Sequence, residues 1–499
     1  MKKIILIIVA LVILPILALH RDASANDNAA LQDDITINED ELFSNPTTVI
    51  ESNDTNDSDA EKEKKRRQFS TTNEKSNHFG ISGEIKHVTH WTIRDKNHLP
   101  TQQLSDINPY VDGVLFFDAR LPNNIKAFAN VEAVYNTDGS NSAVDFETRE
   151  LFIDLNINKA VYFRTGKQVL QWGRCYLFNP TDLINVEKKT FTEKITAREG
   201  TEGIKAHIPF GTYMNMYGFI NTYEMDNFDS TEEFEKISGA YKLEFLVDKT
   251  EMAFSIWGKK DGNPVYGYDF STRILGIDIK GEVSASYGDN NKKLIEQDGI
   301  LYSVIEEDKW IKKCAVDFGK AFDFNNQPDK IQVNLELFYN GSGYDENVFE
   351  DNNLYMFDSP VSIAMDSKTG KSIGSSYSGN FADKQNNAAL FLDNISLLGG
   401  TKTIYMIANG LYEPNYYSEY YAAIFTTVNK FFTSDFSLKA NLISNIEQDS
   451  FIFTTGVDYK NIKDFKAGIS INKYFGADDS EYTFMKNSVD MLITFGITF

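Results

Sequence analysis

Apolar and polar residues alternate with a period of two along much of the chain after residue 78. The clearest case is the segment Val489–Phe499, in which every second residue is apolar and the residues between are small or polar at all positions but Leu492. Side chains of a strand point alternately to opposite faces, so this segment has one apolar and one mostly polar face. Roughly ten residues of tilted strand cross a bilayer. The segment therefore predicts a membrane-spanning strand. An edge strand of a soluble sandwich is the alternative, but one this long and apolar would promote aggregation.

The same alternation recurs in many segments, among them 125–135, 151–155, 331–337, 436–442, 451–459 and 465–475. Turn-forming residues such as those at 156–159 and 460–464 separate neighbouring segments. Between Ile81 and Phe499 the pattern predicts about sixteen to eighteen strands, a number that leaves a water-filled lumen when the sheet closes. We expect an all-β fold, with residues 79–499 forming a single closed transmembrane antiparallel β-barrel. The polar stretches 226–235, 288–308, 341–358 and 366–387 are expected to be its extracellular loops.

The N-terminus has the features of a secretory signal peptide. Lys2 and Lys3 precede an apolar run from Ile4 to Leu19, and small residues follow at 23–25, so residues 1–25 are expected to be removed. Residues 26–78 are polar, acidic and poor in aromatics, which predicts a disordered periplasmic extension. No other stretch is long and apolar enough for a spanning helix. Strands would therefore have to cross the membrane.

The composition of the chain limits the classes of binding partner that can be expected. The formal net charge is −23, and it becomes more negative when the predicted signal peptide, with three bases and one acid, is removed. Nucleic acid is therefore not expected as a partner. The 37 Phe and 25 Tyr residues suit strands and the aromatic girdles of membrane interfaces. Cys175 and Cys314 either pair in an oxidising periplasm or are separate small residues of a wall or loop.

The segment Arg164–Asn185 departs from simple alternation. Gly166 and Gly173 interrupt the strand pattern, and glycine within a strand marks a bend or the close approach of another backbone. Pro180 cannot donate a ladder hydrogen bond, so the strand must stop before it. The segment predicts a structured element folded into the lumen as a constriction. We also expect Thr181 or Asp182 to cap a short helical turn through residues 183–184.

The motifs of this segment are Gly166-Lys167-Gln168, Trp172-Gly173 and Asn179-Pro180-Thr181-Asp182-Leu183. Together they resemble a family of porin-like outer-membrane barrels of undefined function, distantly similar to alginate-export barrels. The resemblance also takes in the strands at 79–84 and 489–499, and it implies a single closed antiparallel barrel. The residues matched as a structural motif are Gly166, Trp172, Gly173, Asn179, Pro180 and Asp182. An aromatic final residue is typical of such barrels, so Phe495 and Phe499 are expected to be read by the barrel-insertion machinery.

Bases outnumber acids near this motif, although the chain as a whole is acidic. Eight Lys or Arg and five Asp or Glu lie between residues 164 and 205. Fixed cations lining a narrow passage attract anions. The sequence thus nominates lumen or constriction residues, which are Arg164, Arg174, Lys188, Lys189, Lys194 and Arg198. The alternative is that these charges are paired with neighbouring carboxylates or are solvated.

No catalytic constellation is evident. His87 and His90 are three residues apart, so on a strand they face opposite ways and cannot share a metal or a proton. The acidic loops lack the fixed spacing of a calcium-binding loop. We therefore expect no enzyme activity, metal or organic cofactor. The expected role is passive diffusion of small hydrophilic solutes through a bacterial outer-membrane channel surrounded by lipid and lipopolysaccharide. The alternative is a plugged barrel with a structural, adhesion or export role.

Overall fold

The computed structural model describes residues 78–94, 105–122, 124–136, 144–170, 172–185, 198–225, 235–363, 365–366, 371–372, 395–460, 464–484 and 487–499. The predicted signal peptide and all but the last residue of the predicted periplasmic extension lie outside these residues. The structure therefore does not test either prediction.

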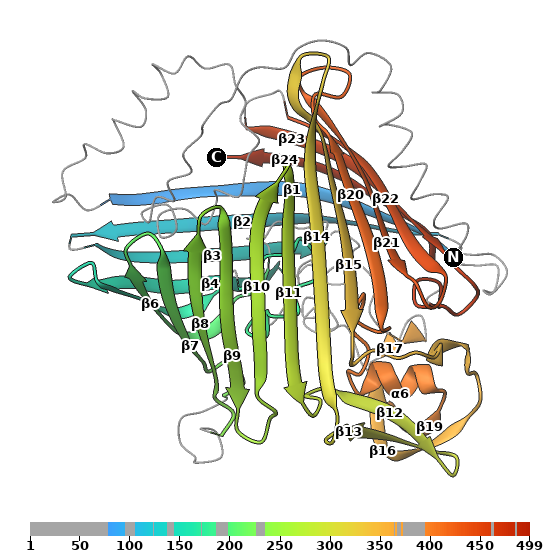
Figure 1. The fold of residues 1–499 in the computed structure, drawn as a ribbon. Coiled ribbons are helices and arrows are strands. Elements are labelled where there is room, and N and C mark those ends of the chain that lie inside the picture. Colours follow the sequence, from blue (N-terminus) through green and yellow to red (C-terminus); the bar gives the residue numbers. More distant parts are fainter. Residues whose placement is uncertain are drawn as a thin grey trace. The chain divides into compact units, whose positions relative to one another are not determined.

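Eighteen strands of the described chain form one closed sheet (Figure 1). Each strand pairs antiparallel with the next one in the barrel, and β1 pairs with β24 to complete the ring, with Thr89 opposite Ile493. The predicted all-β fold, a single closed antiparallel barrel of sixteen to eighteen strands, is thus confirmed. The strands are β1 (His78–Arg94), β2 (Ser105–Leu121), β3 (Ile125–Asn136), β4 (Val144–Ile157), β5 (Val161–Gln168), β6 (Thr201–Phe210), β7 (Met214–Asn221), β8 (Ser238–Val247), β9 (Thr250–Lys259), β10 (Val265–Ile274), β11 (Ile277–Tyr287), β14 (Trp310–Phe324), β15 (Gln327–Asn340), β20 (Tyr420–Val428), β21 (Phe436–Asn445), β22 (Ser450–Tyr459), β23 (Phe465–Phe475) and β24 (Asn487–Thr498).

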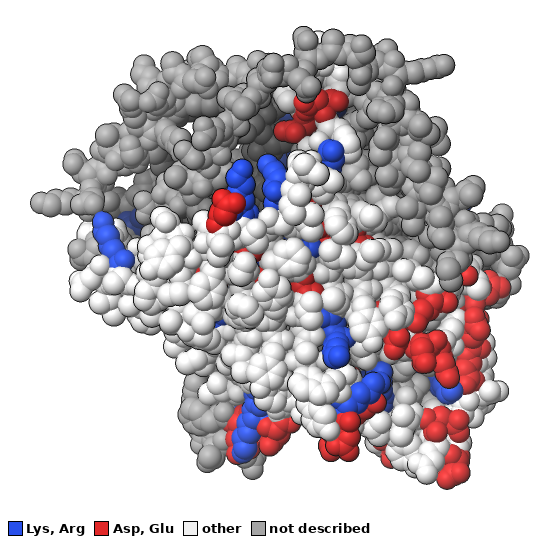
Figure 2. All heavy atoms as spheres, in the orientation of Figure 1, with Lys and Arg blue, Asp and Glu red and all other residues white. Residues whose placement is uncertain are grey.

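The alternation in the sequence separates an apolar outer face from a polar inner face. On β4, Leu151, Ile153 and Leu155 are 57%, 46% and 37% exposed, whereas Phe152 and Asp154 between them are buried. Large apolar side chains on other strands are exposed in the same way, as a lipid-facing surface requires. A broad band of uncharged residues crosses the face shown in Figure 2. The described strands therefore have the surface of a transmembrane barrel.

The two ends of the barrel differ in their connections. At one end the strands are joined by tight turns, in which residues such as Asn325 and Asn326 have φ angles of 50° and 58°. Two successive residues with positive φ are typical of type I′ hairpin turns. Longer connections lie at the other end, after β5, β7, β11 and β15. In outer-membrane barrels the short turns are periplasmic and the long connections extracellular.

A small subdomain is built from two of the long connections. It contains a four-stranded sheet, a helix α6 (Lys402–Ala408) and a 3-10 turn η2 (Val348–Glu350), near the ends of β14 and β15 (Figure 1). Leu301, Phe357 and Tyr405 form one of its cores. The stretches at 288–308 and 341–358, expected to be extracellular loops, thus contain ordered structure in which apolar residues pack beneath α6. The sheet strands are β12 (Lys292–Gln297), β13 (Ile300–Ile305), β16 (Tyr355–Ile363) and β19 (Ile395–Gly400), and a separate pair is β17 (Met365–Asp366) with β18 (Lys371–Ser372).

No helix of the described chain has both the length and the apolar character needed to span a membrane.

Candidate functional site

The chain turns into the barrel after β5 and lies along the inner wall. We call residues 169–185 the inner segment; Gln171 lies outside the described part. Its carbonyl at Trp172 accepts a hydrogen bond from Lys242 Nζ on β8 at 2.6 Å. Further along, the backbone N–H of Phe178 donates to Glu336 on β15 at 2.7 Å. These hydrogen bonds place the segment inside the lumen along β8–β15, and its apolar side chains also contact β20–β23.

Two glycines allow close approach of neighbouring atoms, Gly166 within β5 and Gly173 within the inner segment. Gly166 has φ +122°, and a Cβ there would lie 2.2 Å from the carbonyl oxygen of Leu151. A Cβ on Gly173 would lie 2.4 Å from Asn179 Oδ1 and 2.8 Å from Glu282 Oε1. Both positions therefore require a residue without a side chain. The predicted interruption of the strand at Gly166 is wrong, because β5 continues through Gly166, which pairs with Phe152 and Gly203, and ends at Gln168. Gly173 lies beyond the strand, in the inner segment.

A turn at Asn179–Asp182 reverses the segment. The N–H of Asp182 donates to the carbonyl of Asn179 at 3.0 Å, so Pro180 occupies a turn position where it needs no ladder hydrogen bond. The Asp182 carboxylate accepts from Asn185 Nδ2 at 2.7 Å. Asp182 therefore does not cap a helix, because the described residues 172–185 contain no helical turn. The predicted helical turn through residues 183–184 is wrong.

Two inward-facing glutamates of the wall accept hydrogen bonds from the backbone of the inner segment. Glu282 on β11 and Glu336 on β15 are both fully buried. Glu282 accepts from the N–H groups of Arg174 and Cys175 at 2.5 and 2.7 Å. Glu336 accepts from the N–H of Leu177 at 2.8 Å as well as from Phe178. The amides of an irregular segment thus find acceptors without any strand pairing, which buried amides need.

Arg174 joins the segment to three strands. Its guanidinium donates to Glu244 on β8, Glu251 on β9 and Asp269 on β10. Lys242 Nζ also lies 2.9 Å from Asp269 Oδ2. The planar guanidinium carries several donors in a fixed arrangement, so one side chain can bridge several carboxylates. The acids consequently neutralise Arg174.

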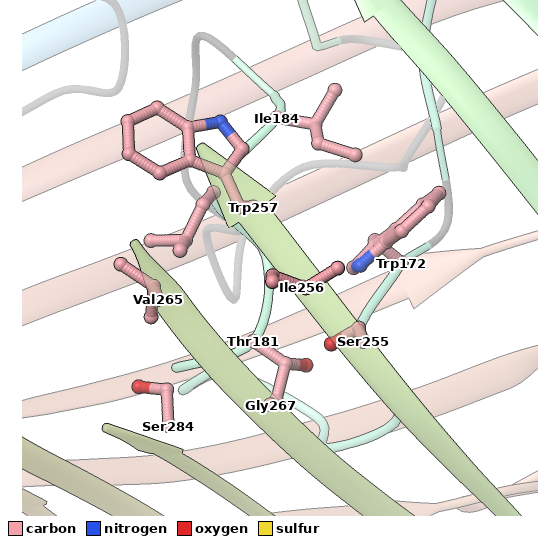
Figure 3. Close-up of a pocket in the computed structure, with 10 residues that line it drawn as sticks. Trp172, Thr181, Ile184, Ser255, Ile256, Trp257, Val265, Gly267 and Ser284 are labelled. Atoms are coloured by element: carbon pink, nitrogen blue, oxygen red, sulfur yellow. The ribbon is translucent and has the colours of Figure 1, made fainter. Parts of the chain in front are cut away.

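Apolar packing holds the tip of the segment. Phe178 stacks on Phe338 of β15 with ring centroids 4.6 Å apart, and Cys175, Leu177 and Phe178 belong to one buried cluster with inward residues of β14, β15 and β20–β23. Between Trp172, Ile184 and the wall remains a cavity of about 10 Å³, lined also by Ser255 and Trp257 (Figure 3). That is room for about one water molecule. The inner segment therefore packs closely against its side of the barrel.

The cations nominated from the sequence lie in different settings. Arg164 faces the lumen and forms a bidentate pair with Asp154, while Arg198 Nη2 lies 3.5 Å from Asp182 Oδ2. Arg174 is held by its three carboxylates. Lys188, Lys189 and Lys194 lie outside the described residues. Each described member of the set is therefore paired with acids, which is the alternative that the sequence left open.

The inner face of β1–β4 is also built from ion pairs. Lys86 Nζ lies 2.7 Å from Asp112 Oδ2, and Arg149 Nε donates to Glu132 Oε2 at 2.9 Å. The inner wall carries charges of both signs at close range. Among the described residues, no three His, Cys, Asp or Glu side chains are arranged to hold a metal ion.

The remaining sequence predictions concern cysteine and the terminal strand. Cys175 is buried in the inner segment, whereas Cys314 is exposed on β14 beside Val283, an exposed residue of the outer face. Both thiols are free, so the disulfide alternative is wrong. Phe495 is 50% exposed on the outer face of β24, and Phe499, directly after the strand, is 57% exposed. Their reading by an insertion machinery stays a prediction.

Sequence reasoning did not find Glu282, Glu336 or Asp269. Each stands at an inward position of a regular strand, where polar residues are expected, so nothing in the local pattern singles it out. Their partners in the inner segment are 95 or more residues away in sequence. Only the closure of the barrel brings them together.

No protein-family model and no curated protein matches the chain. Among solved structures, it is similar to OprD of Pseudomonas aeruginosa, at 9% identity and a TM-score of 0.43, over 84% of this chain and 95% of that one. It is also similar to OccAB4 of Acinetobacter baumannii, at 8% identity and a TM-score of 0.47, over 86% and 100%. A triple mutant of the Rhodopseudomonas blastica porin matches at 7% identity and a TM-score of 0.37, over 85% and 100%. Similarity at this level does not indicate which solutes this chain would pass. The resemblance to alginate-export barrels stays a prediction.

The location of the protein follows from its own architecture. A closed antiparallel barrel with an apolar outer face and a polar inner face is the form in which strands cross the bacterial outer membrane. The chain has both faces on eighteen strands. It is an outer-membrane β-barrel.

Proposed function

We propose that the protein is an outer-membrane channel for passive diffusion of small hydrophilic solutes. The observation that carries this proposal is that the inner segment lies against the wall, with hydrogen bonds to β8–β15 and apolar contacts with β20–β23. A barrel of sixteen to eighteen strands is wide enough to leave an aqueous channel. A segment that folds onto one side narrows such a lumen without needing to fill it. The passage then runs between the inner segment and the inner faces of β1–β5.

The charge pattern of this passage favours weak ion selectivity. Arg164, Arg174 and Arg198 each have a carboxylate partner, so they act as dipoles more than as free cations. A basic constriction would depend on Lys188, Lys189 and Lys194. Replacing Lys188 and Lys189 with Glu should shift the reversal potential toward cations. An unchanged reversal potential would remove these two lysines from the constriction.

A second candidate function rests on the extracellular subdomain. It has two hydrophobic clusters of its own, and Phe349 stacks on Phe484 of the β23–β24 connection with centroids 4.2 Å apart. Asp345, Glu346, Glu350 and Asp358 are exposed acids of this subdomain. A diffusion channel does not need so ordered a surface. The ordered subdomain therefore supports the alternative of a structural, adhesion or export barrel whose extracellular loops bind a partner.

Single-channel recording separates the two functions. The purified, refolded protein is inserted in a planar bilayer under a salt gradient. Stepwise ohmic currents are expected from a channel, and the reversal potential measures its ion preference. Folding is checked by the heat-modifiable migration of intact barrels. A folded protein that gives no current steps would disprove the channel and favour the subdomain as the working surface.

A further inference from the structure

We propose that Glu282 and Glu336 are positioning residues that set the width of the passage by holding the inner segment against the wall. The effect on conductance rests on the proposed channel function. The anchoring itself does not, because it can be measured without any current. The two residues project from neighbouring regions of the inner wall, on β11 and β15.

Glu282 uses both of its carboxylate oxygens. Oε1 accepts from the backbone N–H of Arg174 and of Cys175, at 2.5 and 2.7 Å. Oε2 accepts from the hydroxyl of Thr181 at 2.7 Å and from its N–H at 3.2 Å. One carboxylate thus binds the segment both before the Asn179–Asp182 turn and at Thr181 within it. It holds the turn and the residues that lead into it against the same point of the wall.

Glu336 is arranged in the same way. Its Oε1 accepts from the N–H of Phe178 at 2.7 Å, and its Oε2 accepts from the N–H of Leu177 at 2.8 Å. Phe178 additionally stacks on Phe338, which follows Glu336 by two residues on the same inner face of β15. The carboxylate therefore holds the tip of the segment where the apolar contact also forms.

Glutamine cannot replace either residue without loss. Because both oxygens already face N–H or O–H donors, a glutamine would turn its own NH₂ group toward a donor whichever way it is oriented. Both glutamates are 0% exposed, so water does not readily fill the gap. Breaking a hydrogen bond to a buried charge corresponds to about a ten-fold shift in an equilibrium. Glutamine thus has nearly the same shape as glutamate, and the substitution removes only one hydrogen-bond acceptor oxygen and the negative charge.

Cys175 provides a native reporter of the anchoring. It is 1% exposed, and its own N–H is one of the groups that Glu282 binds. Release of the segment would expose its thiol to the aqueous lumen. Cys314 is on the outer face of β14, so Cys314→Ser leaves Cys175 as the sole thiol. All variants are made in this background.

The test is the rate at which a charged, membrane-impermeant methanethiosulfonate reagent modifies Cys175 in the refolded barrel. Glu282→Gln and Glu336→Gln are expected to raise this rate about ten-fold each, and the double variant to raise it further. The matched control is Glu84→Gln, whose carboxylate lies on β1 and pairs with Lys466 at 3.7 Å. It should label at the parent rate. Equal labelling in the parent, both single variants and the double variant would overturn the proposal.

A milder variant keeps the test valid if a glutamine variant does not fold. Thr181→Val removes only the hydroxyl that donates to Glu282 and should give a smaller increase in labelling. The same proteins are then recorded in planar bilayers, where released segments should change the mean conductance. Labelling that changes in proteins without current would disprove the channel and keep the anchoring. Current with unchanged labelling would disprove the anchoring and keep the channel.

Discussion

Arg164 on β5 and Asp154 on β4 form a bidentate ion pair on the inner face of the barrel, with Nε–Oδ1 and Nη2–Oδ2 distances of 2.6 and 2.8 Å. Their side chains are 13% and 11% exposed. Arg164 also lies 3.8 Å from the centroid of the Phe152 ring, and its backbone is opposite Lys205 in the next strand. Each member of the pair therefore balances the other within the proposed passage.

Removing either member should change the ion preference of the channel in opposite directions. Asp154→Asn leaves Arg164 and Lys205 without this carboxylate, so the reversal potential should move toward anions. Arg164→Gln should move it toward cations, and the double variant should return close to the parent value. The reversal potential, recorded in a salt gradient of about ten to one, measures the ion preference of each variant. Shifts of the same sign for both single variants would contradict the passage along β4 and β5.

Gly173→Ala should dislodge the inner segment, because the new methyl group would meet Asn179 Oδ1 and Glu282 Oε1. Forcing a methyl group into such a contact costs roughly 1–3 kcal/mol. We expect a lower heat-modification midpoint and faster cleavage of the segment by protease. Gly258→Ala is the control, since a Cβ there meets nothing within 4 Å. A stability equal to the control would show that the segment adapts without cost.

The stability of the extracellular end should depend on pH through Glu481. Burial raises the pKa of Glu481 to about 7, although the side chains of Tyr421 and Asn445 and the N–H of Asn415 all donate to its carboxylate. Because the folded state then binds a proton more tightly than the unfolded state does, stability is greatest below the ordinary pKa of 4.5 and falls as pH rises to about 7. The fall is on the order of 3 kcal/mol at most.

Hydrogen exchange of residues 476–484, measured between pH 4 and 8 (roughly spanning both pKa values) and corrected for intrinsic rates, tests this dependence. Glu481→Gln should make the corrected protection independent of pH over this window. A parent protein whose protection rises with pH would show that the three donors outweigh burial.

Leu301→Ala should unfold the subdomain and leave the barrel intact. Leu301 is fully buried beside Phe357 and Tyr405, and removing such a side chain costs about 2–5 kcal/mol. Limited proteolysis should then cut the connections around β12–β13 and β16 while the barrel keeps its heat-modifiable migration. Loss of the folded barrel in the same variant would mean that the two parts fold as one unit.

The barrel wall was largely predictable from the sequence, whereas the contacts inside it were not. On β24 each outward residue faces lipid and each inward residue faces the lumen, so the period of two follows directly from the two environments. The inner segment was also predictable, because Gly173 and Pro180 interrupt that period. The part of the wall to which the inner segment binds was not predictable, since an inward glutamate such as Glu282 has the same local pattern whether it anchors a segment or faces water.

The subdomain escaped prediction for a different reason. The apolar residues of β12 and β13 gain their partners from β16 and α6, and α6 lies about a hundred residues later in the chain. The charged pairs were likewise hidden. Counting bases and acids between residues 164 and 205 gave a local excess of bases, but the acids that neutralise Arg174 come from β8, β9 and β10.

The pairing of β1 with β24 has a consequence for biogenesis. These strands adjoin in space although nearly the whole barrel sequence separates them, so the ring cannot form until every strand has been exported. Until that moment the sheet has two open edges with free backbone donors and acceptors, which attract other chains. A cell that makes this protein must shield both edges in transit and release them only at the target membrane.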